Sequence, residues 1–165
     1  MSDGGPYERW RSAGRFPGFL RREARHEAAH AIVSELVGLG VVFVTLNAYG
    51  RLERGGDHLT LDPFTRHYAP RRTDPRGRER VAIVALAGHA ADGRDWRRCR
   101  GAEGMADGEI VREYVPDPAR QADLWHLARW LTSRYGGRID TLAAELLATE
   151  TVTGERVREI IGHAV

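Results

Sequence analysis

The chain has 165 residues, of which 42% are hydrophobic, and this predicts one compact domain with an apolar core. Its formal net charge is +2 and all 25 basic residues are arginine, but the 23 acidic residues are interspersed with them, which disfavours a nucleic-acid-binding protein. A single cysteine, Cys99, excludes an intrachain disulfide, and no apolar run is long enough for a signal peptide or a membrane span. We therefore expect a cytoplasmic protein without membrane or nucleic-acid partners.

The N-terminal third of the chain predicts an irregular arm followed by a helix. Residues 1–18 mix glycine, proline, arginine and aromatic residues without periodicity, so we expect the single folded domain to span 19–165. Over 21–39 apolar residues recur at steps of three and four, which is typical of an amphipathic helix, and the glycines at 38–40 predict its end.

Two strands and two further helices are expected in the middle of the chain. The β-branched segment 41–50 and the alternating segment 57–61 predict a small hairpin or sheet. The segment 67–80 contains two prolines, a glycine and five arginines, so it reads as a loop. An apolar run over 79–96 predicts a helix, and a shorter helix over 107–115 begins with Asp107 in the N-cap position.

The C-terminal third predicts three helices. Asp117 as a cap, Pro118 in the first turn and the glycines at 136–137 bound the longest helix at about 118–135. Shorter helices are expected over 138–151 and 153–165, the latter opened by Thr153. The fold class is therefore α+β, predominantly helical with one small sheet.

The segment "RHEAAHAIV" carries the most specific chemical signal. His26 and His30 are four residues apart on the predicted helix, so both imidazoles project from one face and can bind one ion. Glu27 lies about 100° round the helix, beside the ion, where its carboxylate can take a proton from water that the metal activates. This is the HExxH pattern of zinc peptidases, and it predicts a zincin-like domain with Zn²⁺ as cofactor.

A catalytic zinc site needs a third protein ligand. The metzincin extension is absent, because Val33 and Leu36 stand where its glycine and third histidine would be. Glu53, a candidate for a glutamate ligand, lies in a predicted turn. His89 is interpreted as a core residue or as a group supporting the ligands, because a lone histidine among apolar residues usually finds a hydrogen bond there.

Residues 22–161 resemble the peptidase domain of the FtsH-type zinc metalloproteases, and more closely the stand-alone FtsH-peptidase-like proteins. "ARHEAAHAIVSELVG" is similar to the family's zinc helix and "VVFVTLNAYGR" to its following strand. Three later segments follow in the family's order: "VALAGHAADG", "LARWLTSRYGG" and "LLATETVTGERV". The resemblance implies a zincin-like fold and a third zinc ligand that is an aspartate at the start of a helix, some seventy-odd residues after the second histidine.

Asp107 fits that position best, since it follows a small-residue turn 77 residues after His30. Asp117 and Asp123 remain alternatives, because the helix corresponding to "LARWLTSRYGG" starts later than the family's order implies. The chain also lacks the family's ATPase, and without lysine it contains no Walker A motif.

The expected function is that of an ATP-independent zinc metallopeptidase that hydrolyses peptides or unfolded protein, with Glu27 as general base and His26, His30 and Asp107 as metal ligands. A strand near 57–61 would accept the extended substrate by edge pairing. The alternative is a non-catalytic, zinc-stabilised interaction or regulatory module with the same fold. Either protein can act as a homo-oligomer or with a partner protein.

Overall fold

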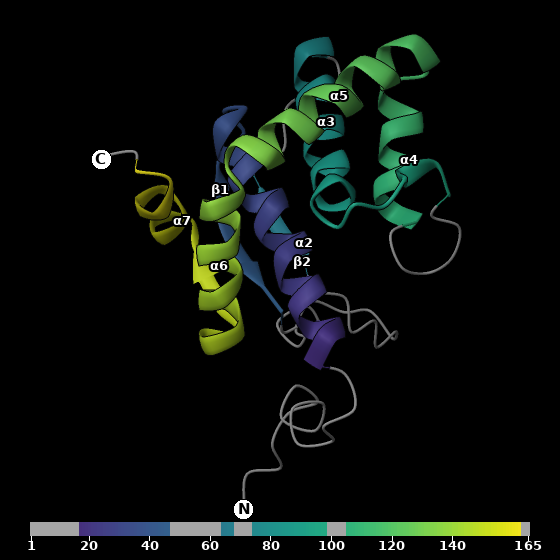
Figure 1. The fold of residues 1–165 in the computed structure, drawn as a ribbon. Helices are drawn as coiled ribbons and strands as arrows, with labels where there is room; N and C mark the ends of the chain where they lie inside the picture. The colour runs from purple at the N-terminus through teal and green to yellow at the C-terminus, as the bar shows by residue number, and fades with distance from the viewer. Residues whose placement is uncertain (1–16, 47–63, 68–73, 99–104, 163–165) are drawn as a thin grey trace, which may run out of the picture.

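Helix α2 (Pro17–Leu36) lies at the centre of the protein, between α6 (Gly136–Thr149) and α3 (Pro75–Ala91) (Figure 1). The computed structural model describes residues 17–46, 64–67, 74–98 and 105–162. The other described elements are β1 (Val41–Thr45), β2 (Phe64–His67), the short 3-10 helix η2 (Trp96–Arg98), α4 (Met105–Tyr114), α5 (Pro118–Arg134), β3 (Thr151–Thr153) and α7 (Gly154–Ile161).

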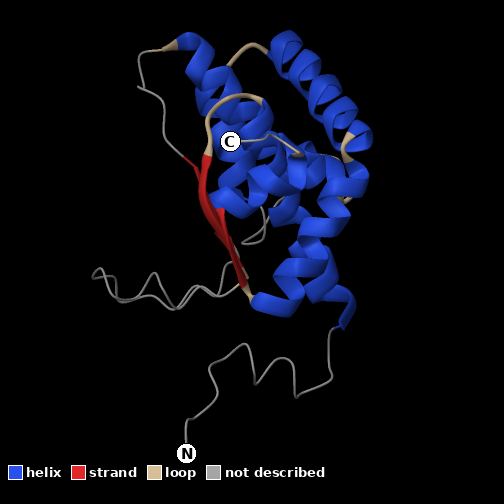
Figure 2. Cartoon of the chain, turned by 90° about the vertical axis from the view of Figure 1, so that its left-hand side faces the viewer, coloured by secondary structure: helices blue, strands red, loops and turns tan. Residues whose placement is uncertain are grey.

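Helices and strands form two sides of the molecule. Figure 2 shows the strands gathered along one side and the helices packed on the other. The face of α2 that meets its neighbours is built from fully buried small and branched residues, namely Ala24, Ala28, Ala31 and Ile32. Alanines on this face let the other helices approach α2 closely, which brings side chains from separate helices within reach of one another.

The caps of the helices follow from local sequence. Asp117 accepts a hydrogen bond from the backbone N–H of Ala119 and precedes Pro118, so α5 begins where the sequence predicts. Thr153 caps α7 in the same way by accepting from the N–H of Arg156. The predicted helix over 118–135 is confirmed, since α5 ends at Arg134.

The sheet has three antiparallel strands in the order β2-β1-β3. Val44 of β1 pairs with Thr65 of β2 on one side and with Val152 of β3 on the other. Gly154 follows β3 where a side chain would overlap the backbone carbonyl of Val41, so this close approach requires glycine. The prediction of an α+β fold dominated by helices is confirmed.

Several expected boundaries are wrong. Helix α3 starts at Pro75, inside the predicted loop 67–80, because Asp74 caps it and Pro75 suits the first helical position. Thr151 and Thr153, predicted as the ends of two helices, form β3 together with Val152, because β1 lies beside them as a partner strand. Helix α2 begins at Pro17, so the expected irregular arm over 1–18 extends two residues too far, and its first sixteen residues lie outside the described residues. The expected strand over 57–61 also lies outside them, and the second strand of the sheet is β2.

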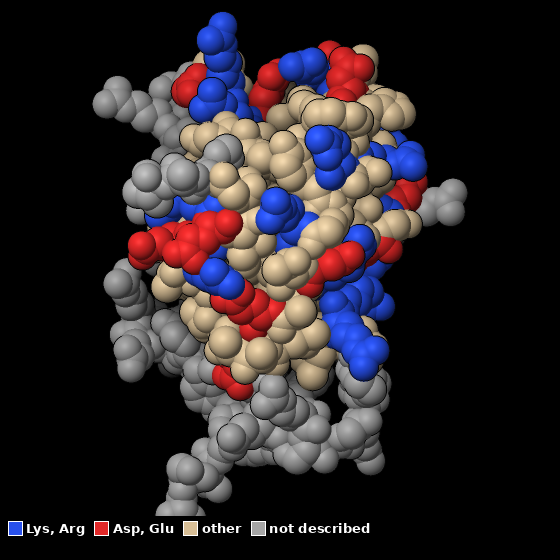
Figure 3. Space-filling model, turned by 60° about the vertical axis from the view of Figure 1, so that its left-hand side comes forward, with Lys and Arg blue, Asp and Glu red and all other residues tan. Residues whose placement is uncertain are grey.

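The described surface carries both signs of charge. Figure 3 shows arginine and acidic side chains interspersed on one face. Arg156, for example, forms ion pairs with Glu145 at 3.0 Å and with Glu159 at 2.7 Å. Among the described residues, none of the helices combines the length and the apolar character that crossing a lipid bilayer would require.

Candidate metal centre

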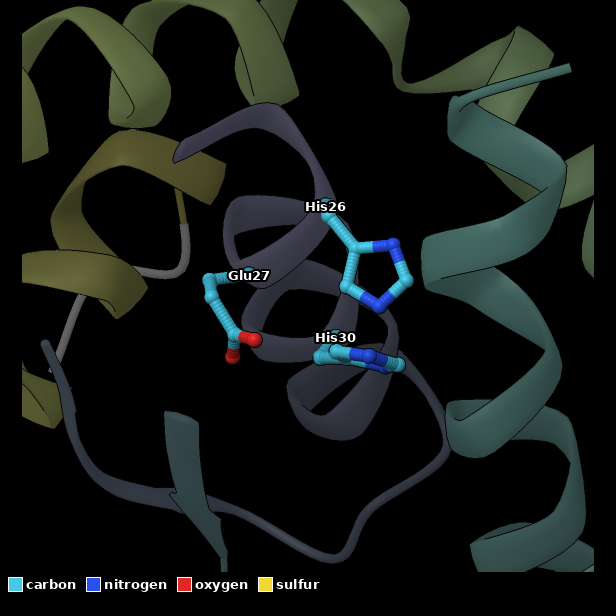
Figure 4. Close-up of side chains that lie close together, drawn as sticks. All are labelled: His26, Glu27 and His30. Atoms are coloured by element: carbon cyan, nitrogen blue, oxygen red, sulfur yellow. The ribbon is translucent and has the colours of Figure 1, made fainter. Parts of the chain in front are cut away.

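Helix α2 presents His26, Glu27 and His30 together in the interior. The three side chains are buried, with exposed fractions of 8%, 5% and 7%. One potential ligand atom from each lies within 4.8 Å of the others, so the group could hold a metal ion. Figure 4 shows the two imidazoles and the Glu27 carboxylate on the same side of α2, with α3 beyond the rings.

The hydrogen bonds of the two histidines fix which nitrogen carries the proton. His26 Nδ1 lies 2.9 Å from Asp92 Oδ2, and His30 Nδ1 lies 2.7 Å from the backbone oxygen of Val84. Both partners can only accept, so each Nδ1 must donate. In the neutral imidazoles both Nε2 atoms therefore present a lone pair, which is the form that a metal ion binds.

Asp107 reaches the same point from α4. Its Oδ2 atom lies 3.3 Å from His26 Nε2 and 3.3 Å from His30 Nε2. Two ligands on one zinc ion at about 2.0–2.1 Å and at tetrahedral angles are about 3.3 Å apart, so these donors have the spacing that a shared ion requires. Asp107 is in the first turn of α4 and not at its N-cap, because the helix starts two residues earlier, at Met105.

The two alternative aspartates do not join this group. Asp117 caps α5, where its carboxylate accepts a hydrogen bond from the backbone N–H of Ala119. Asp123 is exposed and lies 3.7 Å from Arg120. Of the three aspartates that the sequence leaves open, the structure brings only Asp107 to the histidines.

The cluster gathers electron-pair donors that a bound cation would satisfy. Two imidazole lone pairs and a carboxylate oxygen converge, and each of them is an acceptor unless an imidazole is protonated. Burial alone would lower the pKa of His26, but the carboxylates of Asp107 and Asp92 outweigh it and raise the pKa to about 10. In the metal-free protein a proton therefore fills the place that a metal ion would take.

The pKa values of Asp107 and His30 shift in the directions that favour their charged forms. Burial favours the neutral form of Asp107, but His30 and His26 outweigh this effect and hold the pKa of Asp107 well below its usual range. Burial also opposes the charge on His30, yet the charge of Asp107 raises the pKa of that imidazole. The cluster thus has the electrostatic character of a cation site.

Glu27 faces the sheet side of the cluster. Thr65 Oγ1 on β2 lies 3.0 Å from Glu27 Oε2 and also 3.0 Å from the backbone oxygen of Glu27. Burial raises the pKa of Glu27 more than the neighbouring His30 and His26 lower it. A carboxylate with a raised pKa beside a cation site is suited to accept and return a proton.

Gly88 of α3 lies directly against the imidazoles of His26 and His30. A Cβ atom there would overlap the His26 ring and would lie 2.6 Å from His30 Nε2. The absence of a side chain lets α3 pack against the imidazoles, which also brings the Val84 carbonyl to His30.

Sequence reasoning assigned no role to Asp92 or Thr65. Asp92 is the C-cap residue of α3, and its carboxylate accepts a hydrogen bond from His26 Nδ1. A metal-binding histidine ordinarily has such an acceptor on its other ring nitrogen. A search for an acidic residue in the resembling segment "VALAGHAADG" could have found it. Thr65 had no local signal, because only the pairing of β2 with β1 places it over α2.

The chain matches no model of a known protein family, and it matches none of the curated proteins at a significant level.

Proposed function

We propose that the chain is an ATP-independent zinc metallopeptidase-like domain of the FtsH type. The observation that carries the proposal is the position of Glu27, a buried carboxylate that is grouped with His26 and His30 and hydrogen-bonded by Thr65, next to the contacts of both histidines with Asp107. A purely structural metal site has no use for a proton acceptor in that position. The HExxH spacing and the family resemblance of residues 22–161 support the same proposal.

His26, His30 and Asp107 would hold the ion. When bound, zinc supplies a Lewis acid that makes a neighbouring water more acidic and polarises the scissile carbonyl. The proposed ion is zinc or a related metal, because imidazole nitrogens bind such metals better than they bind magnesium or calcium.

Glu27 moves the protons of the reaction. Its carboxylate takes one proton from water as the water oxygen bonds to the carbonyl carbon, and it returns that proton to the amine nitrogen as the C–N bond breaks. The products are a carboxylic acid and an amine, so no oxidant or further reactant is needed. The Thr65 hydroxyl holds the carboxylate in place through its 3.0 Å contact.

The substrate would be an extended peptide or an unfolded segment. Among the strands that the structure describes, β2 is at one edge of the sheet, and its Thr65 touches Glu27. A peptide paired with this edge would run beside the Glu27 carboxylate. The sequence predicted edge pairing near 57–61, and β2 now takes that role in the proposal.

The decisive experiment compares zinc content and peptide hydrolysis in native protein and in Glu27→Gln. We expect the variant to keep about one zinc per chain and to lose turnover by at least about a hundredfold, because the amide accepts no proton. Glu109→Gln, an exposed carboxylate on α4, is the matched control and should behave as native protein. Equal hydrolysis by Glu27→Gln and native protein would remove Glu27 from the mechanism.

The alternative function is a zinc-stabilised interaction or regulatory module. It predicts full zinc occupancy with no hydrolysis in native protein and no effect of Glu27→Gln. The same pair of measurements therefore separates the two functions.

A further inference from the structure

A third histidine, His89, lies near the Asp107 carboxylate oxygen that both His26 and His30 approach. His89 Nε2 on α3 lies 3.7 Å from Asp107 Oδ2, the atom that is 3.3 Å from each of the other two Nε2 atoms. The side chain of His89 is almost wholly buried, with 1% exposed. Three imidazoles from two helices therefore surround one carboxylate oxygen.

The distance of His89 is too long for a hydrogen bond but suits two donors on one ion. A donor and acceptor 3.7 Å apart exceed the usual hydrogen-bond range. Two donors on the same zinc ion can be separated by up to about 4.2 Å, twice the usual bond length. The distance between His89 Nε2 and Asp107 Oδ2 therefore fits two donors on one ion better than a direct hydrogen bond.

The packing of α3 explains how His89 reaches this point. Gly88 lies against the rings of His26 and His30 without a side chain between them. The rings of His26 and His89 are 5.3 Å apart between centroids and nearly perpendicular, at 87°. The His26 and His30 rings have a similar edge-to-face arrangement, with centroids 4.6 Å apart and an angle of 83°.

We propose that His89 is a fourth side chain of the metal centre, so that three imidazoles and the Asp107 carboxylate hold the ion. The inference rests on the proposed metal centre. Four side chains fill the positions around a tetrahedral ion, so the proposed hydrolysis then requires water as a fifth ligand, a coordination number that catalytic zinc can reach. Three nitrogen donors would favour zinc, cobalt, nickel or copper over magnesium and calcium more strongly than two would.

The test counts bound imidazoles in cobalt-substituted protein. Each imidazole bound through Nε2 gives one strongly shifted proton signal from its Nδ1–H in the NMR spectrum, so native protein should show three. His89→Gln should show two, and its dissociation constant for zinc should rise at least about tenfold. His126→Gln, which replaces an exposed histidine on α5, should keep three signals and native affinity.

Every outcome bears on the assignment. Two shifted signals in native protein, or three in His89→Gln, would overturn it even if the protein hydrolyses peptides. Failure of native protein to bind cobalt or zinc would overturn both this assignment and the metal centre. Three signals without hydrolysis would support His89 and count against the peptidase proposal alone. If His89→Gln does not fold, the count in native protein decides by itself.

Discussion

His26 donates a hydrogen bond of 2.9 Å from Nδ1 to Oδ2 of Asp92, a residue 66 positions later in the chain. The Asp92 side chain is 1% exposed, and its charge is balanced by Arg94, whose Nη2 lies 3.2 Å from the same oxygen. This contact holds the His26 ring so that its Nε2 faces Asp107. An anionic partner on the far nitrogen also makes an imidazole a stronger metal ligand.

Replacing Asp92 should therefore weaken metal binding without touching a ligand. We expect Asp92→Asn to raise the dissociation constant for zinc by about 10–100-fold, measured by competition with a chromophoric chelator. Asp123→Asn, whose side chain is 70% exposed, is the control and should bind zinc as native protein does. Native affinity in Asp92→Asn would show that the ring needs no anionic support.

Gly88→Ala should disrupt the same centre from α3. The new methyl group would overlap the His26 ring and press on His30, so either α3 or the rings must move. We expect zinc binding to be lost and the free energy of unfolding to fall by about 1–3 kcal/mol, as judged by urea titration.

Gly136→Ala is a suitable control for that substitution. Gly136 is also helical, but a Cβ atom there would meet nothing within 4 Å. This variant should keep its zinc and should be as stable as native protein or slightly more so. Equal effects of the two substitutions would mean that Gly88 has no special place at the metal centre.

The stability of the metal-free protein should depend on pH through His26. Its pKa is raised to about 10 in the folded state from a usual value near 6.5, so its protonated form stabilises the fold. This contribution is fully present below about pH 6.5 and is lost as the pH rises toward 10. The raised pKa of His30 acts in the same direction.

Asp107→Asn provides the comparison, because it removes a charge that raises the pKa of both histidines. With a chelator present, we expect the free energy of unfolding to fall more steeply between pH 6 and 10 in native protein than in the variant. Urea titrations at pH 6, 8 and 10 measure both slopes. Parallel slopes would mean that the Asp107 carboxylate does not stabilise protonated imidazoles.

Thr65→Val should change the pH dependence of the proposed hydrolysis and not the metal content. The Thr65 hydroxyl lowers the pKa of Glu27 by hydrogen bonding to its carboxylate, and valine has nearly the same shape without the hydroxyl. Without the hydrogen bond the pKa of Glu27 rises further, so activity should fall at a higher pH on the acid side. Profiles of kcat/KM against pH, with zinc content measured in parallel, test this. An unchanged acid limb of the kcat/KM profile would show that Thr65 does not influence the pKa of Glu27.

Local sequence determined much of the helical framework. The Asp117-Pro118 pair and the Thr153 cap place the starts of α5 and α7, because a capping side chain and the helix it caps are neighbours in sequence. The spacing of His26 and His30 likewise depends only on the helical repeat, so their shared face followed without tertiary information.

The strands and the loop boundaries were harder to predict from the sequence. Residues 151–153 form β3 only because β1 lies beside them, and a three-residue strand leaves no pattern of its own. The start of α3 was hidden in a segment rich in proline and arginine, where the Asp74-Pro75 cap was the one local signal.

What only the tertiary structure decided is which distant groups meet the His26 and His30 face of α2. The family resemblance left Asp107, Asp117 and Asp123 open, and of these three the structure brings Asp107 alone to His26 and His30. Asp92 and His89 arrive through the packing of α3 against α2 at Gly88. Sequence periodicity describes one helix at a time, whereas a metal centre depends on the angle and distance between helices, which are set by the packing of the whole core.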